Sequence, residues 1–115
     1  MSLAAGVVLD VGPADAVDVA SQAGFDGVGL WFDPASWTAQ TSRTVAERLR
    51  DTGVVALDIE PVIVGRDADA GGRLVDAGME VGARHALVAS GSAERDEVVD
   101  QLGALADRAA GSDLV

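Results

Sequence analysis

The chain has 115 residues, about half of them hydrophobic, which suits one globular domain over residues 1–115 and is too short for two. Its net charge of −11, with arginine as the basic residue throughout, disfavours binding to nucleic acid or to an anionic membrane surface. Cysteine is absent, so disulfides and thiolate metal sites are excluded. Apolar runs stay well short of the roughly 18 residues that a membrane span needs, and we expect a cytoplasmic protein.

Three glycines divide the chain at a constant interval. Gly24, Gly53 and Gly82 each precede an apolar run and stand 29 residues apart, and the same step leads to Gly111. A fixed period of this length is typical of a repeated supersecondary unit. Each unit reads as a strand, a polar loop and a helix closed by glycine, so Leu114 and Val115 would begin a fifth strand.

The first unit predicts a strand over residues 5–11, AGVVLDV, followed by a helix. Pro13 suits the first helical turn, because its fixed φ and missing N–H are tolerated there. An apolar stripe of alanine and valine then runs to Ala23, and Gly24 fits the left-handed position that ends a helix.

The later units predict three more strands, each after one of the periodic glycines, and three more helices. The second helix is expected over residues 42–52, with Thr44 and Glu47 as its capping box. The third is expected over 68–81, and the fourth over 93–110 with Ser92 as its cap.

Alternation of apolar strands and helices predicts an α/β fold with parallel strands covered by helices. Eight units of 29 residues would make about 230 residues, close to the ~250 of a (β/α)8 barrel. The four units of this chain therefore predict half of such a TIM barrel. An open four-stranded α/β sheet is the alternative architecture.

The segment GVVALDIEP, residues 53–61, places two carboxylates in a strand that we expect to end at Pro61. Side chains alternate between the faces of a strand, so Val55, Leu57 and Ile59 should face the helices. Ala56, Asp58 and Glu60 should then face the barrel interior. Glu60 would lie at the carboxyl end of the strand, where the active sites of this architecture are built.

Candidate site residues other than Glu60 come from the loops that follow the strands. Asp10 follows the first predicted strand in the corresponding place, and the alternative is that it caps a turn or pairs with an arginine. Trp31, with Phe32 and Trp37, would suit stacking on a sugar ring, or else packing beneath the loop. Arg66 could meet an anionic group of a substrate, or be an ordinary solvated arginine. His85 begins the fourth strand at the end opposite the site, which favours a structural role.

The segments AGFDGVGLW, DTGVVALDIEPV and EVGARHALVAS resemble the N-terminal half of the sugar phosphate isomerase/epimerase family, the xylose isomerase-like TIM barrels. The resemblance runs from about residue 5 to the end of the chain. It implies isomerisation or epimerisation of a sugar or sugar phosphate by proton transfer next to a carbonyl, assisted by Mn²⁺ or Mg²⁺. Glu60 matches a pocket acid of the family, whereas Gly29 stands where many members carry glutamate.

The metal ligands of that family lie mainly in the second half of the barrel, so no metal is expected on this chain alone. One hypothesis is an enzyme completed by a second half, supplied by another chain or by self-association, which predicts a homo-oligomer or a complementing partner. The other is a truncated α/β domain that binds or interacts without chemistry.

Overall fold

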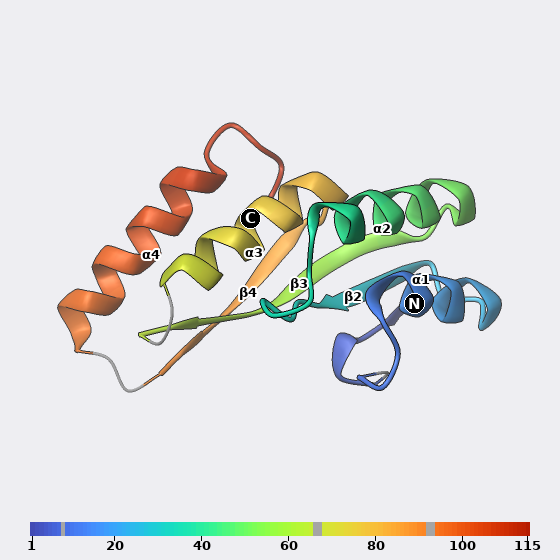
Figure 1. Cartoon of the computed structure of the whole chain (residues 1–115), viewed down its shortest axis with the longest axis horizontal. Coiled ribbons are helices and arrows are strands. Elements are labelled where there is room, and N and C mark those ends of the chain that lie inside the picture. The colour runs from blue at the N-terminus through green and yellow to red at the C-terminus, as the bar shows by residue number, and fades with distance from the viewer. Residues whose placement is uncertain (8, 66–67, 92–93) are drawn as a thin grey trace.

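The computed structural model describes residues 1–7, 9–65, 68–91 and 94–115. Its strands and helices alternate along the chain (Figure 1). The strands are β1 (Ser2–Leu3), β2 (Gly27–Trp31), β3 (Val55–Val64) and β4 (His85–Ser90). The helices are α1 (Pro13–Gln22), α2 (Ala39–Thr52), α3 (Ala68–Val81) and α4 (Arg95–Ala109), with a short 3-10 helix, η1 (Ala5–Val7).

The strands form one parallel sheet in the order β1-β2-β3-β4, as the alternation of elements predicts. Right-handed crossovers place successive helices on the same side of such a sheet. Each helix packs against the next, α1 on α2, α2 on α3 and α3 on α4. Figure 1 shows α2, α3 and α4 lying along one side of the strands. The opposite face of the sheet, which we call the open face, has no helix layer among the described elements.

The glycine period is a structural period. Gly24, Gly53, Gly82 and Gly111 have φ values of 84°, 72°, 70° and 82°, in the left-handed region that glycine enters without a Cβ clash. The first three close α1, α2 and α3, and the last follows the end of α4. The 29-residue spacing therefore marks the same turn of the chain each time.

Two helix starts differ from the prediction. Helix α2 begins at Ala39, and Thr38 and Thr41 cap each other's backbone N–H groups, so the expected capping box at Thr44 and Glu47 is wrong. Thr44 lies inside the helix, where its hydroxyl donates to the Gln40 carbonyl. For α4, the N-cap position is Glu94, and Ser92 lies outside the described residues.

The predicted first strand over residues 5–11 is wrong. The strand is Ser2–Leu3, paired with Gly27 and Val28, and the chain then turns into η1. Ala5 crosses the open face at Gly29, where its backbone nitrogen would lie 2.8 Å from a Cβ built on that glycine. Because Gly29 has no side chain, the chain can turn across the open face at Ala5, and its pairing with β2 ends just before that turn, at Leu3.

Strand β3 is longer and less regular than expected. It continues past Pro61 to Val64. Its pairing with β4 is interrupted between Ile59 and Val62, so the backbone N–H that Pro61 lacks is not needed there. A second irregularity opposite Val28 and Gly29 leaves Leu57 as an extra residue. Ala56 therefore pairs with Val28 on the helix side, while Val55 and Leu57 lie beside Gly27 on the open face, which reverses the prediction for all three.

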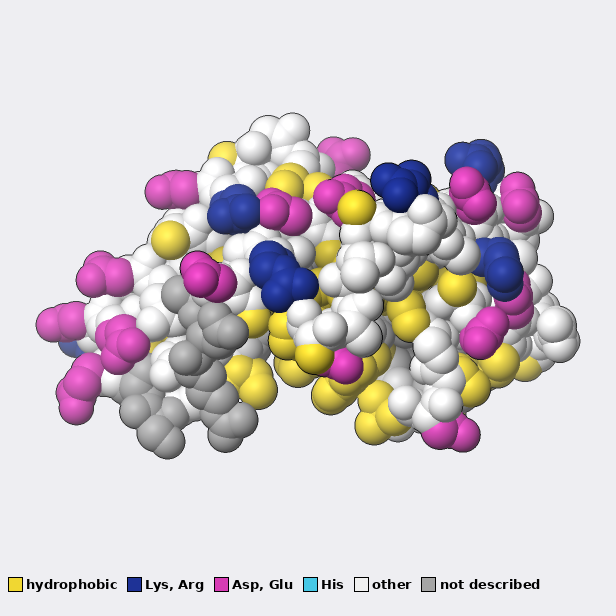
Figure 2. Space-filling model, viewed as in Figure 1, with side chains coloured by type: hydrophobic (Ala, Val, Ile, Leu, Met, Phe, Trp, Pro, Cys, Tyr) yellow, Lys and Arg dark blue, Asp and Glu magenta, His cyan; other side chains and the backbone are white. Residues whose placement is uncertain are grey.

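The core lies between the sheet and the helices. Both the strands and the helices contribute its largest fully buried side chains, which are Val17, Val28, Leu30, Val45, Ile59, Val64 and Leu74. Among the described helices none is both long and apolar enough to cross a membrane. Figure 2 shows acidic side chains spread over the helices and hydrophobic ones gathered along the lower side of the view.

Candidate functional site

Two carboxylates and an exposed tryptophan share the open face of the sheet. In the parallel register, Asp58 of β3 stands beside Gly29 of β2, and Glu60 stands beside Trp31. Paired residues of neighbouring strands point to the same face. Asp58 and Glu60 were predicted to face this side, and the register confirms that orientation.

The carboxylate of Asp58 lies partly buried in the space above Gly29. Its Oδ1 atom is buried and has no hydrogen-bond partner among the described residues. A Cβ on Gly29 would lie 2.6 Å from that oxygen, so glycine provides the space that the carboxylate occupies. A buried acceptor without a donor is costly and is often a functional atom. Because Oδ1 is covered by the surrounding chain, a ligand can reach the half-buried Asp58 carboxylate only through its other oxygen.

Glu60 has altered acidity. Partial burial, and then the negative charge of Asp58, raise the pKa of the Glu60 carboxyl above its ordinary value. A carboxyl group with a raised pKa is a stronger base once it is ionised, and it gives or takes a proton closer to neutral pH. The sequence indicated where Glu60 points, but its acidity depends on burial that only the fold supplies.

A cavity of about 340 Å³ opens at the carboxyl ends of β2 and β3. Trp31 and Asp33 line it from β2 and the loop that follows, Pro61 and Ile63 from β3, and Gly71 from the second turn of α3. Trp31 lines this cavity and also stands beside Glu60 in the sheet, and it is 43% exposed. Neither Asp58 nor Glu60 lines the cavity, and Trp31 is the residue that connects it to the carboxylates in the candidate site.

The other two aromatic residues of the loop after β2 are core residues. Phe32 and Trp37 are buried, with ring centroids 5.4 Å apart, and the Trp37 indole donates to the Ser42 hydroxyl at 2.8 Å. Of the two possibilities that the sequence left open, packing beneath the loop therefore holds for this pair. Only Trp31 of the three remains available to a ligand.

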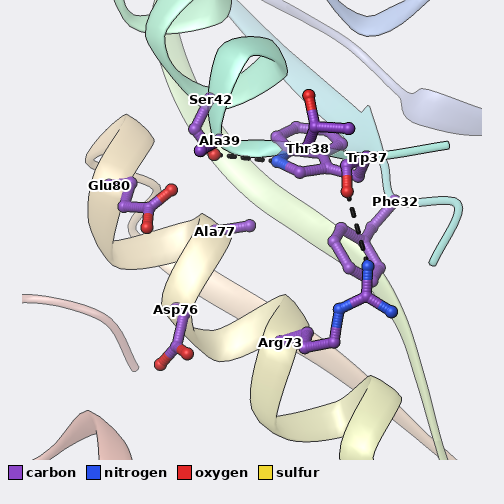
Figure 3. Close-up of a pocket in the computed structure, with 9 residues that line it drawn as sticks. All are labelled: Phe32, Trp37, Thr38, Ala39, Ser42, Arg73, Asp76, Ala77 and Glu80. Atoms are coloured by element: carbon purple, nitrogen blue, oxygen red, sulfur yellow. Dashed lines mark hydrogen bonds between the residues drawn. The ribbon is translucent and has the colours of Figure 1, made fainter.

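Arg73 of α3 anchors the same loop from outside, a role that sequence reasoning missed. Its guanidinium donates to the carbonyl oxygens of Pro34 at 2.8 Å and Trp37 at 3.4 Å. Figure 3 shows Arg73 reaching across a groove between α2 and α3 toward Trp37. The contact spans more than thirty-five residues of chain and has no signature in the sequence around Arg73.

The structure places the remaining predicted residues as follows. Asp10 lies in an exposed turn and not at a strand end, and no hydrogen bond or ion pair of the described residues joins it to β2 or β3. Arg66 lies outside the described residues. His85 begins β4 as expected, but its register beside Asp58 brings it closer to the carboxylates than the prediction allowed.

The described residues do not form a metal site. No group of three histidine, aspartate or glutamate side chains lies close enough together among them to hold a metal ion. Mn²⁺ and Mg²⁺ favour several oxygen ligands, and Asp58 and Glu60 supply carboxylates from one strand only. We therefore derive no chemical step through a metal.

Comparisons with known proteins support the architecture. The structure superposes on an uncharacterised protein from Parabacteroides distasonis with a TM-score of 0.72 and 11% identity, over 94% of this chain and 48% of that one. It superposes on a xylose isomerase-like TIM barrel/4-hydroxyphenylpyruvate dioxygenase fusion protein with a TM-score of 0.71 and 23% identity, over 98% of this chain and 20% of that one. The chain has the α/β fold of half a TIM barrel. It spans less than half the length of either protein, and no protein-family profile or curated protein matches it.

Proposed function

We propose that the chain forms part of the substrate pocket of a barrel that isomerises or epimerises a sugar or sugar phosphate. The observation that carries the proposal is the ionisable pair of Asp58 and Glu60 on the open face, with the pKa of Glu60 raised. Support also comes from the fold likeness to a protein named as a xylose isomerase-like TIM barrel. Such barrels build their sites at the carboxyl ends of the strands. Trp31 ends β2, whereas Glu60, contrary to the prediction, lies four residues before the end of β3 and reaches this edge only as the neighbour of Trp31.

In this proposal Glu60 takes a proton from the carbon next to the sugar carbonyl, which leaves an enolate. For isomerisation it returns the proton to the carbonyl carbon while the neighbouring hydroxyl proton moves to the carbonyl oxygen. For epimerisation an acid of the complementing half would protonate the same carbon from the opposite face. Asp58 is half-buried and accepts a hydrogen bond from a sugar hydroxyl through Oδ2, because Oδ1 is covered by the chain. Trp31 packs against the apolar face of the sugar ring. A divalent metal of the kind the resemblance implies would take most of its ligands from the complementing half of the barrel.

Binding is the first test. We expect phosphorylated and unphosphorylated ketoses, such as fructose 6-phosphate and fructose, to change the fluorescence of the chain saturably through Trp31. The Glu60→Gln substitution should weaken that binding about tenfold, the effect of one lost charge-assisted hydrogen bond. Glu47→Gln is the matched control, since Glu47 is an exposed acid on α2. Equal affinity of the Glu60→Gln and Glu47→Gln variants would contradict the proposal.

Proton transfer is the second test. Incubation of a bound ketose in D₂O should introduce deuterium at the carbon next to the carbonyl, measured by NMR of the sugar. The rate should rise with pH as Glu60 ionises through its raised pKa, because the base form takes the proton. The Glu60→Gln variant should lose the exchange. Binding without exchange in the wild-type chain, in the presence and absence of Mn²⁺, would instead indicate a non-catalytic binding domain.

A further inference from the structure

His85 faces the same side of the sheet as the two carboxylates. It stands beside Asp58 in the parallel register of β3 and β4, and paired residues of neighbouring strands point to the same face. Because Asp58 lies on the open face, the imidazole of His85 lies there too. Neighbouring strands are about 4.8 Å apart, so the two side chains start close together. His85 is exposed, and its ring is therefore accessible to a ligand that contacts Asp58.

The backbone of His85 is fixed on both sides. On one side it pairs with β3. On the other, the N–H of Val115 donates to the Arg84 carbonyl at 2.8 Å, and the N–H of Ala86 donates to the Val115 carbonyl at 2.8 Å. This is the pattern of a parallel pair in which Val115 stands beside His85, so the expected start of a fifth strand is present as one bridge. His85 is thus a well-positioned residue of the sheet.

The surroundings of Glu60 are more apolar than those of Asp58. On the β2 side, Glu60 stands beside Trp31. On the β4 side, Leu87 lies opposite the interrupted stretch of β3 that contains Glu60. Leu87 follows His85 by two residues and so points to the open face, where it is 53% exposed. Two large apolar side chains therefore flank Glu60.

The open face thus carries two adjacent rows of different chemistry. The apolar row is Trp31, Glu60 and Leu87, and the polar row is Gly29, Asp58 and His85. Two residues of a strand separate the rows, a distance of about 6.6 Å. A ketose that spans them would place its reacting carbons between the apolar side chains and its oxygens beside the carboxylate and the imidazole.

We propose that His85 carries the oxygen-bound proton in the isomerisation, a role that rests on the function proposed above for Glu60 and Asp58. After Glu60 has taken the carbon proton, the protonated imidazole gives its proton to the enolate oxygen. The neutral imidazole then takes the proton of the neighbouring hydroxyl. As the new carbonyl forms there, Glu60 returns its proton to the former carbonyl carbon. Both side chains end as they began, and no further reactant is needed.

Histidine suits this step because its ring nitrogens give and take protons in the neutral range. Asp58 accepts the hydrogen bond of a sugar hydroxyl in the same row, which holds the oxygens beside the imidazole. Epimerisation returns a proton to the same carbon and needs no transfer between oxygens. The placement of His85 therefore favours the exchange of an aldose and a ketose over epimerisation.

The test separates the carbon proton from the oxygen proton. Fructose is incubated with the chain in D₂O, and NMR follows deuterium at its first carbon and the appearance of glucose and mannose. His85→Gln should slow formation of the aldoses about 100-fold, the usual effect of losing a general acid–base group. Deuterium entry, which depends on Glu60, should stay within about twofold of wild type, because the substitution leaves that carboxylate in place. Arg84→Gln, at the exposed residue just before His85, should change neither rate.

The outcomes distinguish this inference from the function on which it rests. Absence of deuterium entry in the wild-type chain would contradict the proposed function and this inference with it. Deuterium entry without aldose in the wild-type chain would overturn the role of His85 alone. Unchanged aldose formation in the His85→Gln variant would do the same, and so would an equal loss of both rates, which would make His85 a structural residue.

A binding measurement tests the contact without turnover. His85 is the only histidine of the sequence, so the carbon-bound protons of its imidazole give a single set of NMR signals. Saturating fructose should shift these signals, and the shift should be absent with glycerol at the same concentration. Signals that stay in place at saturation would overturn the inference whatever the variant rates.

Discussion

Gly29 shapes the candidate site without carrying a functional group. Its missing side chain leaves room on the open face for the Asp58 carboxylate and for the backbone of Ala5. With the chain turning over Gly29 at Ala5, any side chain at residue 29 would collide with two neighbours.

Gly29→Ala should therefore lower the free energy of unfolding by about 1–3 kcal/mol, the usual cost of forcing an extra carbon into a packed place. Equilibrium unfolding in urea measures it. Gly6→Ala is the control, because a Cβ at Gly6 would meet nothing within 4 Å. Equal stability of the Gly29→Ala and Gly6→Ala variants would show that Ala5 and Asp58 can move aside freely.

At the same scale, the sequence predicted the direction of Asp58 and Glu60 but not that of Ala56 and Leu57. Alternation is reliable only while each residue has one partner, and the extra residue at Leu57 reverses it for the residues before. The extra residue arises from how β3 pairs with β2, and the sequence of β3 alone does not show that pairing. The raised pKa of Glu60 has the same origin, since burial arises only on folding.

The helices contain glycines with two different roles, and α4 offers a direct comparison with α3. Gly103 of α4 lies in helical backbone, and a Cβ there would meet nothing within 4 Å. Gly71 of α3 is crowded, because a Cβ would come within 3.3 Å of Leu105 and Val62. Gly71 thus lets α3 approach both α4 and the sheet, whereas Gly103 makes no close approach.

Gly103→Ala should raise the free energy of unfolding by about 1 kcal/mol, since alanine is the better helix former and fits without contact. Gly71→Ala should give no such gain, because the helix preference is offset by overpacking. Thermal and urea unfolding of the two variants provide the measurement. A gain from Gly71→Ala equal to that from Gly103→Ala would mean that the contact between α3 and α4 is loose.

Element positions were predictable where a local signal fixed them. Pro13 marked the start of α1, and the periodic glycines marked the ends of three helices. The start of α2 was missed because the reciprocal cap uses two threonines, Thr38 and Thr41, and not the usual threonine and glutamate. The first strand was missed because its place depends on how the chain packs over Gly29, a contact distant in sequence.

For the whole molecule, one ion pair joins the last helix to its neighbour. Arg108 of α4 donates to both carboxylate oxygens of Asp76 on α3, at 2.7 and 2.6 Å. These hydrogen bonds hold the pKa of the Asp76 carboxyl below its usual range. Both side chains remain partly exposed, so the pair is screened by solvent and its effect on stability is modest.

The sign of this effect predicts a pH dependence. A carboxyl group whose pKa is lowered by folding stabilises the fold above its unfolded pKa, and the stabilisation is lost as pH falls through the lowered value. Asp76→Asn should therefore lower the urea midpoint slightly near neutral pH, and the difference from wild type should vanish in acid. Asp51→Asn, at an exposed acid of α2, should show no such convergence. A difference that persists in acid would assign the role of Asp76 to packing.

The architecture of the whole molecule followed from the repeat more surely than any single element did, because four units at one spacing average out local errors. Every 29 residues the backbone returns to a left-handed glycine in the turn that follows a helix. For this molecule the repeating unit is one strand with its helix, closed each time by a left-handed glycine.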